Sequence, residues 1–267
     1  MKITVSTLAV LLSASGAVAQ NACADGKTLT DGTLTIATGN PAYYPWVMDD
    51  APESGEGFEA AVAYAVAEKM GFDAGAVTWV RTSFDEAIQP GAKNFDMNMQ
   101  QYSITPERDE MVDFSAPYYV APMAVLLSPG VEAEATMEAL KTLKWGAVGS
   151  TTAVPMLTDM IQPEQDLLLY GDNADVNAAM TAGQIDAALF DLPTALFLSA
   201  VMIEGSSVIG QFPASPDEGD AFGMLMEDGN PLKDCVDAAL AELTESGELA
   251  AIEARWLQDA TGVPLVE

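Results

Sequence analysis

Histidine is absent from the 267 residues, and only 10 lysines and arginines stand against 40 aspartates and glutamates. Without histidine, the chain can form neither a Ser-His-Asp triad nor an ordinary zinc site. A formal net charge of −30 repels nucleic acids and anionic membrane surfaces, so we expect neither as a partner. No phosphate-binding glycine motif is present, and we expect no cofactor and no metal. The strongest candidate for a cation site, the segment from Asp172 to Asp175, lacks EF-hand spacing and is expected to cap a helix instead.

Apolar runs long enough to cross a membrane are also lacking. The short run from Leu8 to Leu12 lies between Lys2 and Ala17-Val18-Ala19, which is the layout of a secretory signal. We therefore expect residues 1–19 to be removed, leaving a soluble exported chain with a net charge of −31 because Lys2 is lost. Lipid attachment at Cys23 is the weaker alternative, since the leucine usual in such signals is missing.

The two cysteines, Cys23 and Cys235, lie far apart in the sequence and neither belongs to a CxxC motif. In an oxidising compartment, an even number of distant cysteines favours a disulfide, although two free thiols are the alternative. The bridge would tie the N-terminal segment to a C-terminal helix.

Hydrophobic periodicity predicts alternating strands and helices along most of the chain. A first cycle has strands at 33–38, 77–80 and 95–99 and helices at 57–70 and 83–88. A second cycle has helices at 137–143, 153–161, 175–182 and 193–203 and strands at 144–148, 167–170 and 186–190. An acid-rich stretch then precedes a strand at 221–226 and helices at 231–246 and 247–256.

This order indicates an α/β fold of two lobes, each a mostly parallel sheet flanked by helices. Two apolar extended segments, 120–127 and 221–226, are expected to join the lobes as hinge strands. Lobe one would comprise residues 20–120 and 218–267, and lobe two residues 121–217. A cleft at the carboxyl ends of parallel strands is where such sheets bind small molecules.

Five segments resemble those of the polar amino-acid (family 3) periplasmic solute-binding proteins that feed ABC importers: GNPAYYPW, GFEAAVAYAVAEKMGF, SITPERDEMVDFSAPYY, GSTT and GQIDAALFDL. The resemblance extends over nearly the whole mature chain. It implies a two-lobed, type II-like fold that closes on a ligand, and it assigns roles to individual positions.

The resemblance assigns the ligand's α-carboxylate to Arg108, whose planar guanidinium matches a carboxylate in geometry and charge. Ser103 and Thr151 would contact the same carboxylate from opposite lobes. The alternative for Arg108 is an ion pair with an acid on its own segment, namely Glu107, Asp109 or Asp113.

The α-ammonium is assigned to Asp191 and Gln101. The alternative for Asp191 is capping of the helix that follows it. Tyr43, Trp46 and Phe84 would form an aromatic wall around the ligand's side chain, although each aromatic could belong to a core instead.

Asn40 stands where relatives that bind basic amino acids often carry an aspartate, which favours a neutral or modestly polar ligand side chain. Arg81 and Gln100 could instead face an acidic side chain, and Arg81 could equally be a surface residue. The sequence does not identify the side chain.

The expected function is capture of an L-amino acid in the periplasm by a monomer and its delivery to the permease of an ABC importer. The alternatives are an exported dehydratase acting on cyclohexadienyl carboxylates and an organic-acid-binding protein. A sensor module or a partner of a periplasmic oxidoreductase is a third class. An enzyme would need a general acid with a raised pKa in the cleft.

Overall fold

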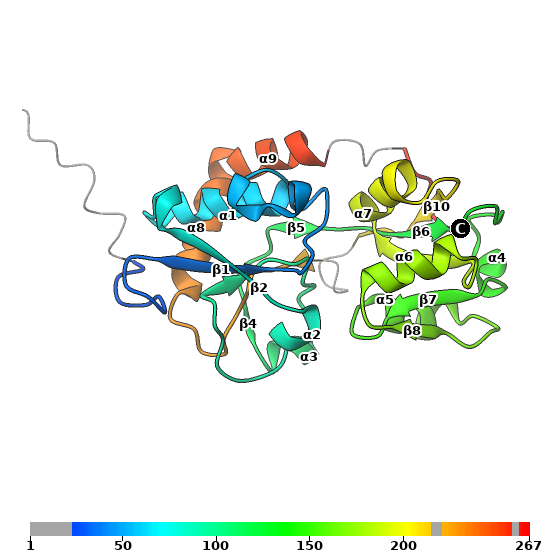
Figure 1. Cartoon of the computed structure of the whole chain (residues 1–267), viewed down its shortest axis with the longest axis horizontal. Helices are drawn as coiled ribbons and strands as arrows, with labels where there is room; N and C mark the ends of the chain where they lie inside the picture. The colour runs from blue at the N-terminus through cyan, green and yellow to red at the C-terminus, as the bar shows by residue number, and fades with distance from the viewer. Residues whose placement is uncertain (1–22, 215–220, 258–261) are drawn as a thin grey trace, which may run out of the picture.

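The computed structural model describes residues 23–214, 221–257 and 262–267, which form two lobes (Figure 1). The expected signal, residues 1–19, lies outside the described residues. Among the residues described, no helix combines the length and the apolar character needed to cross a bilayer.

Lobe one is built on a five-stranded sheet with a core on each face. Its strands are, in spatial order, β2 (Val77–Arg81), β1 (Leu34–Thr38), β3 (Met97–Asn98), β12 (Leu225–Met226) and β4 (Asp113–Phe114). Helices α1 (Phe58–Lys69), α8 (Lys233–Ser246) and α9 (Glu248–Trp256) cover one face, and α2 (Phe84–Ala87) and α3 (Pro106–Asp109) lie on the other side (Figure 1). Leu34 and Ile36 enter the first core and Ala37 the second, because side chains alternate along a strand.

Lobe two repeats this plan. Its sheet has the order β10 (Ser207–Gln211), β6 (Met123–Leu127), β9 (Ala187–Asp191), β7 (Trp145–Val148) and β8 (Leu168–Tyr170). One core includes residues of α6 (Asn173–Thr181) and α7 (Leu192–Phe197), and the other residues of α4 (Met137–Lys141) and α5 (Ala153–Pro155). Helices α5 and α7 continue as the π-helical segments η4 (Met156–Ile161) and η5 (Leu198–Met202).

A two-stranded antiparallel ribbon lies between the lobes (Figure 1). It consists of β5 (Tyr119–Val120) and β11 (Ala221–Phe222), with Tyr119 opposite Phe222. β6 follows β5 after two residues, so the chain enters lobe two directly from the hinge.

The two-lobed α/β architecture confirms the prediction, but the sheets are mixed where we expected mostly parallel ones. The β1–β2, β1–β3, β7–β8 and β7–β9 pairings are parallel, whereas β6, β10 and β12 pair antiparallel with their neighbours. Parallel neighbours need a crossover helix. β6 and β12 instead follow closely on the hinge strands, so each can run against its neighbours.

Two further details differ from the sequence analysis. Strand β10 was not predicted. The C-terminal residues 262–267, which we placed in lobe one, lie on lobe two: Leu265 bridges Gln211 of β10, and the Glu267 backbone N–H donates to the Ala135 carbonyl at 2.9 Å. Their short apolar sequence gives no period that would assign them to either sheet.

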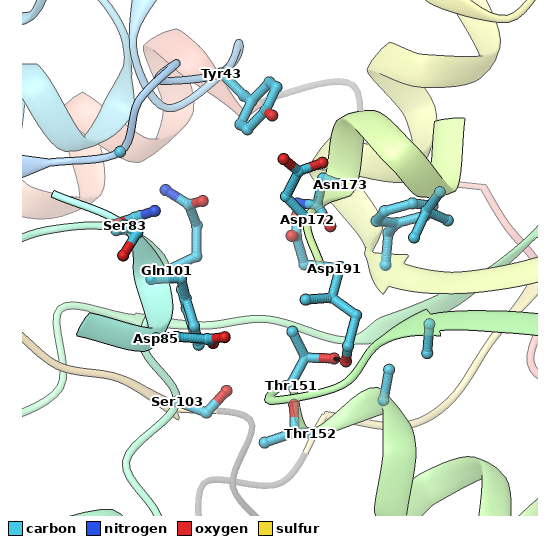
Figure 2. A pocket seen from close by; sticks show the side chains of 18 of the residues that line it. Tyr43, Ser83, Asp85, Gln101, Ser103, Thr151, Thr152, Asp172, Asn173 and Asp191 are labelled. Atoms are coloured by element: carbon cyan, nitrogen blue, oxygen red, sulfur yellow. Dashed lines mark hydrogen bonds between the residues drawn. The ribbon is translucent and has the colours of Figure 1, made fainter. Parts of the chain in front are cut away.

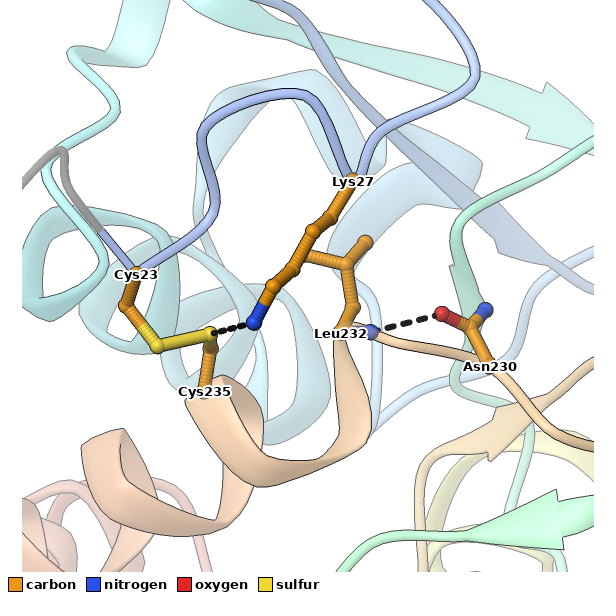
Figure 3. The surroundings of a disulfide bond; sticks show 5 residues. All are labelled: Cys23, Lys27, Asn230, Leu232 and Cys235. Carbon is orange, nitrogen blue, oxygen red and sulfur yellow. Dashed lines mark hydrogen bonds between the residues drawn. A yellow bond between two sulfur atoms is a disulfide. The ribbon is translucent and has the colours of Figure 1, made fainter.

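Cys23 and Cys235 form a disulfide, as predicted (Figure 3). The Lys27 ammonium donates to the sulfur of Cys235 at 3.5 Å, and the Leu232 N–H donates to the Asn230 side chain at 2.9 Å where α8 begins. The bond joins the N-terminal segment to α8 and leaves Cys23 no free thiol for lipid attachment.

Replacing both cysteines by serine is expected to lower the free energy of unfolding by about 3 kcal/mol, because the bridge closes a long loop in the unfolded chain. For a chain of this size the melting temperature should fall by about 6–12 °C. Thermal unfolding of the variant, with reduced wild-type protein as the control, tests this. Equal melting temperatures for oxidised wild type and variant would contradict it.

Candidate functional site

A cavity of about 280 Å³ lies between the lobes, a volume that suits a small solute. Both sheets contribute residues that immediately follow parallel strands. From lobe one these include Asn40 and Tyr43 after β1, Phe84 and Asp85 after β2, and Gln101 and Ser103 after β3; from lobe two they include Thr151 and Thr152 after β7, Asp172 and Asn173 after β8, and Asp191 at the end of β9. The carboxyl ends of parallel strands therefore meet across the cavity, as expected for open α/β sheets.

Arg108 lies in α3, whose N-terminus is capped by the Thr105 hydroxyl. Its side chain lines the cavity and is only 6% exposed. One guanidinium nitrogen donates to the Ser103 carbonyl at 2.8 Å, and the other donates across the lobes to the Ser150 carbonyl at 2.9 Å. The guanidinium also lies 5.3 Å from the centre of the Phe84 ring.

No ion pair within the described residues includes Arg108. The predicted alternative, a pair with Glu107, Asp109 or Asp113, is therefore not observed. Burial lowers the pKa of Arg108 from its usual value because the cation has lost water, and the nearby charge of Glu107 offsets this only in part. A buried cation beside a cavity is complementary to an anionic group of a ligand.

Asp191 lies across the cavity from Arg108 in lobe two. It caps α7, accepting the Thr194 backbone N–H at 2.8 Å, so the predicted capping role is observed together with the cavity position. Burial raises its pKa to about 6, and no lysine or arginine pairs with it among the described residues. This carboxylate would be stabilised by a cationic group placed in the cavity.

Gln101 is fixed by hydrogen bonds to a buried glutamate that the sequence analysis did not identify. Glu59, buried in the first turn of α1, accepts the Gln101 backbone N–H at 2.8 Å and also the Gln101 side-chain amide. The Tyr118 hydroxyl is its third donor. These bonds hold Gln101 in the left-handed backbone region, at φ 52°. Burial, opposed by these hydrogen bonds, raises the pKa of Glu59 to about 7.

The two ends of the cavity differ in their side chains (Figure 2). Ser103, Thr151 and Thr152 gather at one end, and Tyr43 and Asp172 at the other. Burial and the nearby charge of Asp172 raise the pKa of Tyr43.

Asp172 caps α6, as predicted, by accepting the Asp175 backbone N–H at 2.9 Å. Asp85 adds another carboxylate to the lining. The sequence analysis missed both as cavity residues, although each follows a predicted strand that ends at the cleft.

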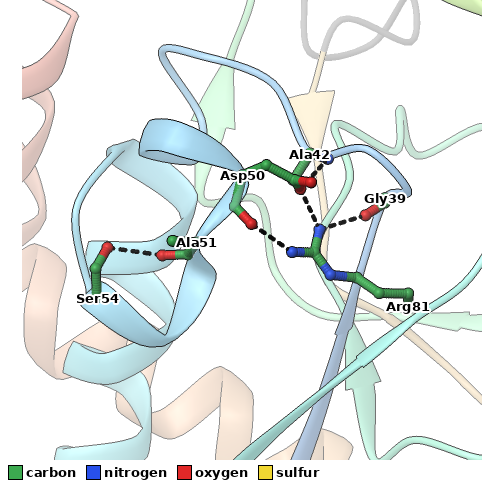
Figure 4. Close-up of polar contacts among 6 residues, drawn as sticks. All are labelled: Gly39, Ala42, Asp50, Ala51, Ser54 and Arg81. Carbon is green, nitrogen blue, oxygen red and sulfur yellow. Dashed lines mark hydrogen bonds and ion pairs between the residues drawn. The ribbon is translucent and has the colours of Figure 1, made fainter.

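Arg81 fixes the loop that carries Asn40 and Tyr43 (Figure 4). It pairs with the Asp50 carboxylate at 2.6 Å and donates to the Gly39 carbonyl at 2.7 Å. Asn40 and Gln100 line the cavity, whereas Arg81 is not among the lining residues. Arg81 therefore supports the loop rather than facing a ligand.

Phe84 lines the cavity and stacks on Tyr102, with ring centres 4.5 Å apart. Trp46, the third residue of the predicted aromatic wall, is not among the lining residues. Its side chain is fully buried against Phe58, and its indole N–H donates to the Thr194 hydroxyl at 2.9 Å. Eight of the nine predicted binding residues thus lie around one cavity, and Trp46 lies behind it.

The raised pKa of Glu59 has a consequence for stability. The folded protein keeps a proton on Glu59 at pH values where the unfolded chain, with an ordinary pKa near 4.5, has released it. The free energy of unfolding should therefore fall as pH rises from about 4.5 to 8, by about 3 kcal/mol from this group.

Urea unfolding of ligand-free protein between pH 5 and 8 at fixed ionic strength measures this slope. Glu59→Gln should reduce it to the smaller slope that Asp191, with a pKa of about 6, still contributes, whereas Glu68→Gln, the same change on the exposed face of α1, should keep the wild-type slope. Parallel slopes for Glu59→Gln and wild type would show that Glu59 does not titrate in this range.

Comparison with known proteins places this geometry in a family. The L-cystine-binding protein of Escherichia coli K12 is 28% identical over 232 residues, covering 86% of this chain and 84% of that protein. A solved arginine-specific periplasmic binding protein of Salmonella typhimurium is 25% identical with a TM-score of 0.68, covering 84% of this chain and 98% of that one. An ancestral amino acid-binding protein described as a precursor of cyclohexadienyl dehydratase is 26% identical with a TM-score of 0.66, covering 84% and 95%. The model of the bacterial extracellular solute-binding proteins, family 3, matches residues 34–259, and the chain belongs to that family.

Proposed function

We propose that the protein captures an L-α-amino acid between its lobes and delivers it to the permease of an ABC importer. The observation that carries this proposal is a pair of unpaired charges on opposite walls of one cavity, of which Arg108 is buried and Asp191 partly buried. Arg108 in lobe one has only carbonyl partners, and Asp191 in lobe two has no cationic partner among the residues described. A zwitterion supplies the missing partner to each.

The surrounding donors and acceptors support the same orientation. Ser103 and Thr151 lie at the end of the cavity that would receive the α-carboxylate with Arg108. The Thr151 hydroxyl donates to the Val148 carbonyl at 2.8 Å, which orients its oxygen. Gln101, held by Glu59, would complete the α-ammonium site beside Asp191.

The side-chain end of the ligand would then lie by Tyr43 and Asp172. Asp85 and Asp172 bring negative charge to the cavity in addition to Asp191, while Arg108 is its one lining cation in the described residues. This charge balance favours a cationic side chain, in contrast to the neutral one that Asn40 suggested. An aromatic ring next to a carboxylate suits an ammonium or guanidinium group.

Capture would take place outside the cytoplasm, after removal of residues 1–19 as a secretory signal, and a monomer would suffice. Lobe two adds contacts only when the lobes are closed, so the ligand favours the closed form. The closed form would dock on the permease. Membership of the extracellular solute-binding family supports export and transport.

An exported dehydratase is the second candidate, because a buried carboxyl with a pKa of about 6 could act as a general acid. The discriminating chemistry is the ammonium: a cyclohexadienyl carboxylate without an amino group offers nothing to Asp191. Relatives named as binding proteins support binding rather than catalysis.

Thermal unfolding of ligand-stripped, refolded protein tests the proposal. An L-amino acid at a hundred times its Kd should stabilise the protein by about 2.7 kcal/mol, or about 5–11 °C. The same compounds lacking the α-amino group or the α-carboxylate should give no shift. Shifts by amine-free acids alone, or turnover of a cyclohexadienyl acid, would overturn it.

Substitutions test the roles of Arg108 as the partner of the α-carboxylate and of Asp191 as the partner of the α-ammonium. Arg108→Gln and Asp191→Asn should each raise Kd by at least 30-fold, because each leaves one buried ligand charge unpaired. Arg255→Gln and Asp186→Asn, the same changes outside the cavity, should leave Kd unchanged. Wild-type affinity in Arg108→Gln would contradict the carboxylate role.

Asp172→Asn tests the side-chain preference by calorimetry. It should raise the Kd of L-arginine about tenfold and leave that of L-glutamine unchanged, since only the cationic side chain loses a charged partner. An equal effect on both ligands would show that Asp172 does not discriminate between ligands by the charge of their side chain.

A further inference from the structure

Trp46 makes a buried hydrogen bond from one lobe to the other. It follows β1 in lobe one, and its fully buried ring packs edge-on against Phe58, Tyr119 and Phe222 at centroid distances of 5.7–5.8 Å. Its indole N–H nevertheless donates to the hydroxyl of Thr194, in α7 of lobe two, at 2.9 Å. Because the other three rings belong to lobe one and the hinge ribbon, this bond is the polar link between that aromatic cluster and lobe two.

Thr194 also holds Asp191. The Thr194 backbone N–H donates to one Asp191 oxygen at 2.8 Å, while the Thr194 hydroxyl receives the indole N–H. A single residue therefore connects the cavity carboxylate of lobe two to a side chain of lobe one.

Both residues of this hydrogen bond are buried in apolar surroundings, so breaking it costs free energy. Thr194 is 8% exposed and Trp46 has no exposed surface. Beside them, Tyr44 of lobe one and Phe197 of lobe two pack with ring centres 4.4 Å apart. A buried donor that loses its partner in such an apolar environment is costly, so separating the lobes here requires water to reach the indole or the bond to be lost.

We propose that Trp46 and Thr194 form a latch, a hydrogen bond that stabilises the closed arrangement of the lobes and positions Asp191 for the ligand. Trp46 is in this sense a positioning residue, because it does not line the cavity. The effect on affinity rests on the proposed amino-acid binding, whereas the effect on lobe arrangement does not.

The chain offers a matched control for the loss of an indole hydrogen bond. Trp145 is also fully buried, and its N–H donates to the Leu140 carbonyl at 2.9 Å within lobe two. Trp46→Phe and Trp145→Phe remove the same atoms from equally buried sites, so they should lower the melting temperature of ligand-free protein similarly. Only Trp46→Phe breaks a bond between lobes.

Calorimetry with L-arginine and L-glutamine measures the first consequence. Trp46→Phe and Thr194→Val should each raise Kd about 5- to 30-fold, mainly through faster dissociation, and the double variant should be no weaker than either single one. Thr194→Ser, which keeps the hydroxyl, should restore binding, and Trp145→Phe should stay within about twofold of wild type. Equal effects of Trp46→Phe and Trp145→Phe, or additive effects of Trp46→Phe and Thr194→Val, would overturn the latch.

A second measurement separates the latch from the identity of the ligand. Amide hydrogen exchange over residues 192–197 of ligand-free protein should be faster in Trp46→Phe than in wild type and Trp145→Phe. The reason is that Thr194, whose N–H bonds to the capping residue Asp191, loses its hydrogen bond to Trp46. If no L-amino acid binds wild type, the proposed function fails while this comparison still decides the latch. Unchanged exchange in Trp46→Phe, together with unchanged affinity where a ligand binds, would reject it.

Discussion

The cavity is arranged around a buried guanidinium with which no carboxylate of the described residues forms an ion pair. Arg108 is held by two carbonyls, Ser103 of its own lobe and Ser150 of the other, which fix its direction but leave its charge uncompensated. In the same cavity Asp191 is a partly buried carboxylate, and no lysine or arginine pairs with it among the described residues. Each charge is unfavourable alone, and both are relieved by a molecule that carries the opposite charges at the right separation. In the proposed function, these two incomplete ion pairs would account for the recognition of a zwitterion.

Topology explains why these groups meet. In both sheets the parallel strands end at the space between the lobes, so each loop that follows a strand delivers side chains to one cavity. The residues behind them then fix those side chains: Glu59 holds Gln101, and Arg81 with Asp50 holds the loop of Tyr43. Binding residues come from loops, but their positions are set by helices and strands, which is how a mobile two-lobed protein keeps a defined site within each lobe.

Periodicity was sufficient for most of the helices, because it is a local feature, and an even number of distant cysteines favoured the disulfide. The cavity residues were identified by resemblance to the family 3 solute-binding proteins, not by periodicity. Sequence patterns were insufficient where the partner of a residue is distant. Trp46 has the same local sequence whether its ring faces a ligand or a core, and its indole bond depends on Thr194, 148 positions away. Glu59 reads as an ordinary acid in the first turn of a helix, yet folding removes it from water. Asp172 was recognised as a cap, and the fact that a cap can also face the cleft follows only from the strand before it.

Among the described residues, contacts between the lobes include the hydrogen bonds of Arg108 with Ser150 and of Trp46 with Thr194, and the ring contact of Tyr44 with Phe197. Such contacts define the relative position of the two lobes in the closed state but contribute little to its stability. A ligand can shift an equilibrium only by the difference in its affinity for the two states, so closure must be nearly balanced for a small solute to control it. A large apolar interface would hold the lobes shut whether or not the cavity was filled. The unpaired charges of Arg108 and Asp191 would instead disfavour closure over an empty cavity. A solute that pairs with both charges would then favour the closed state.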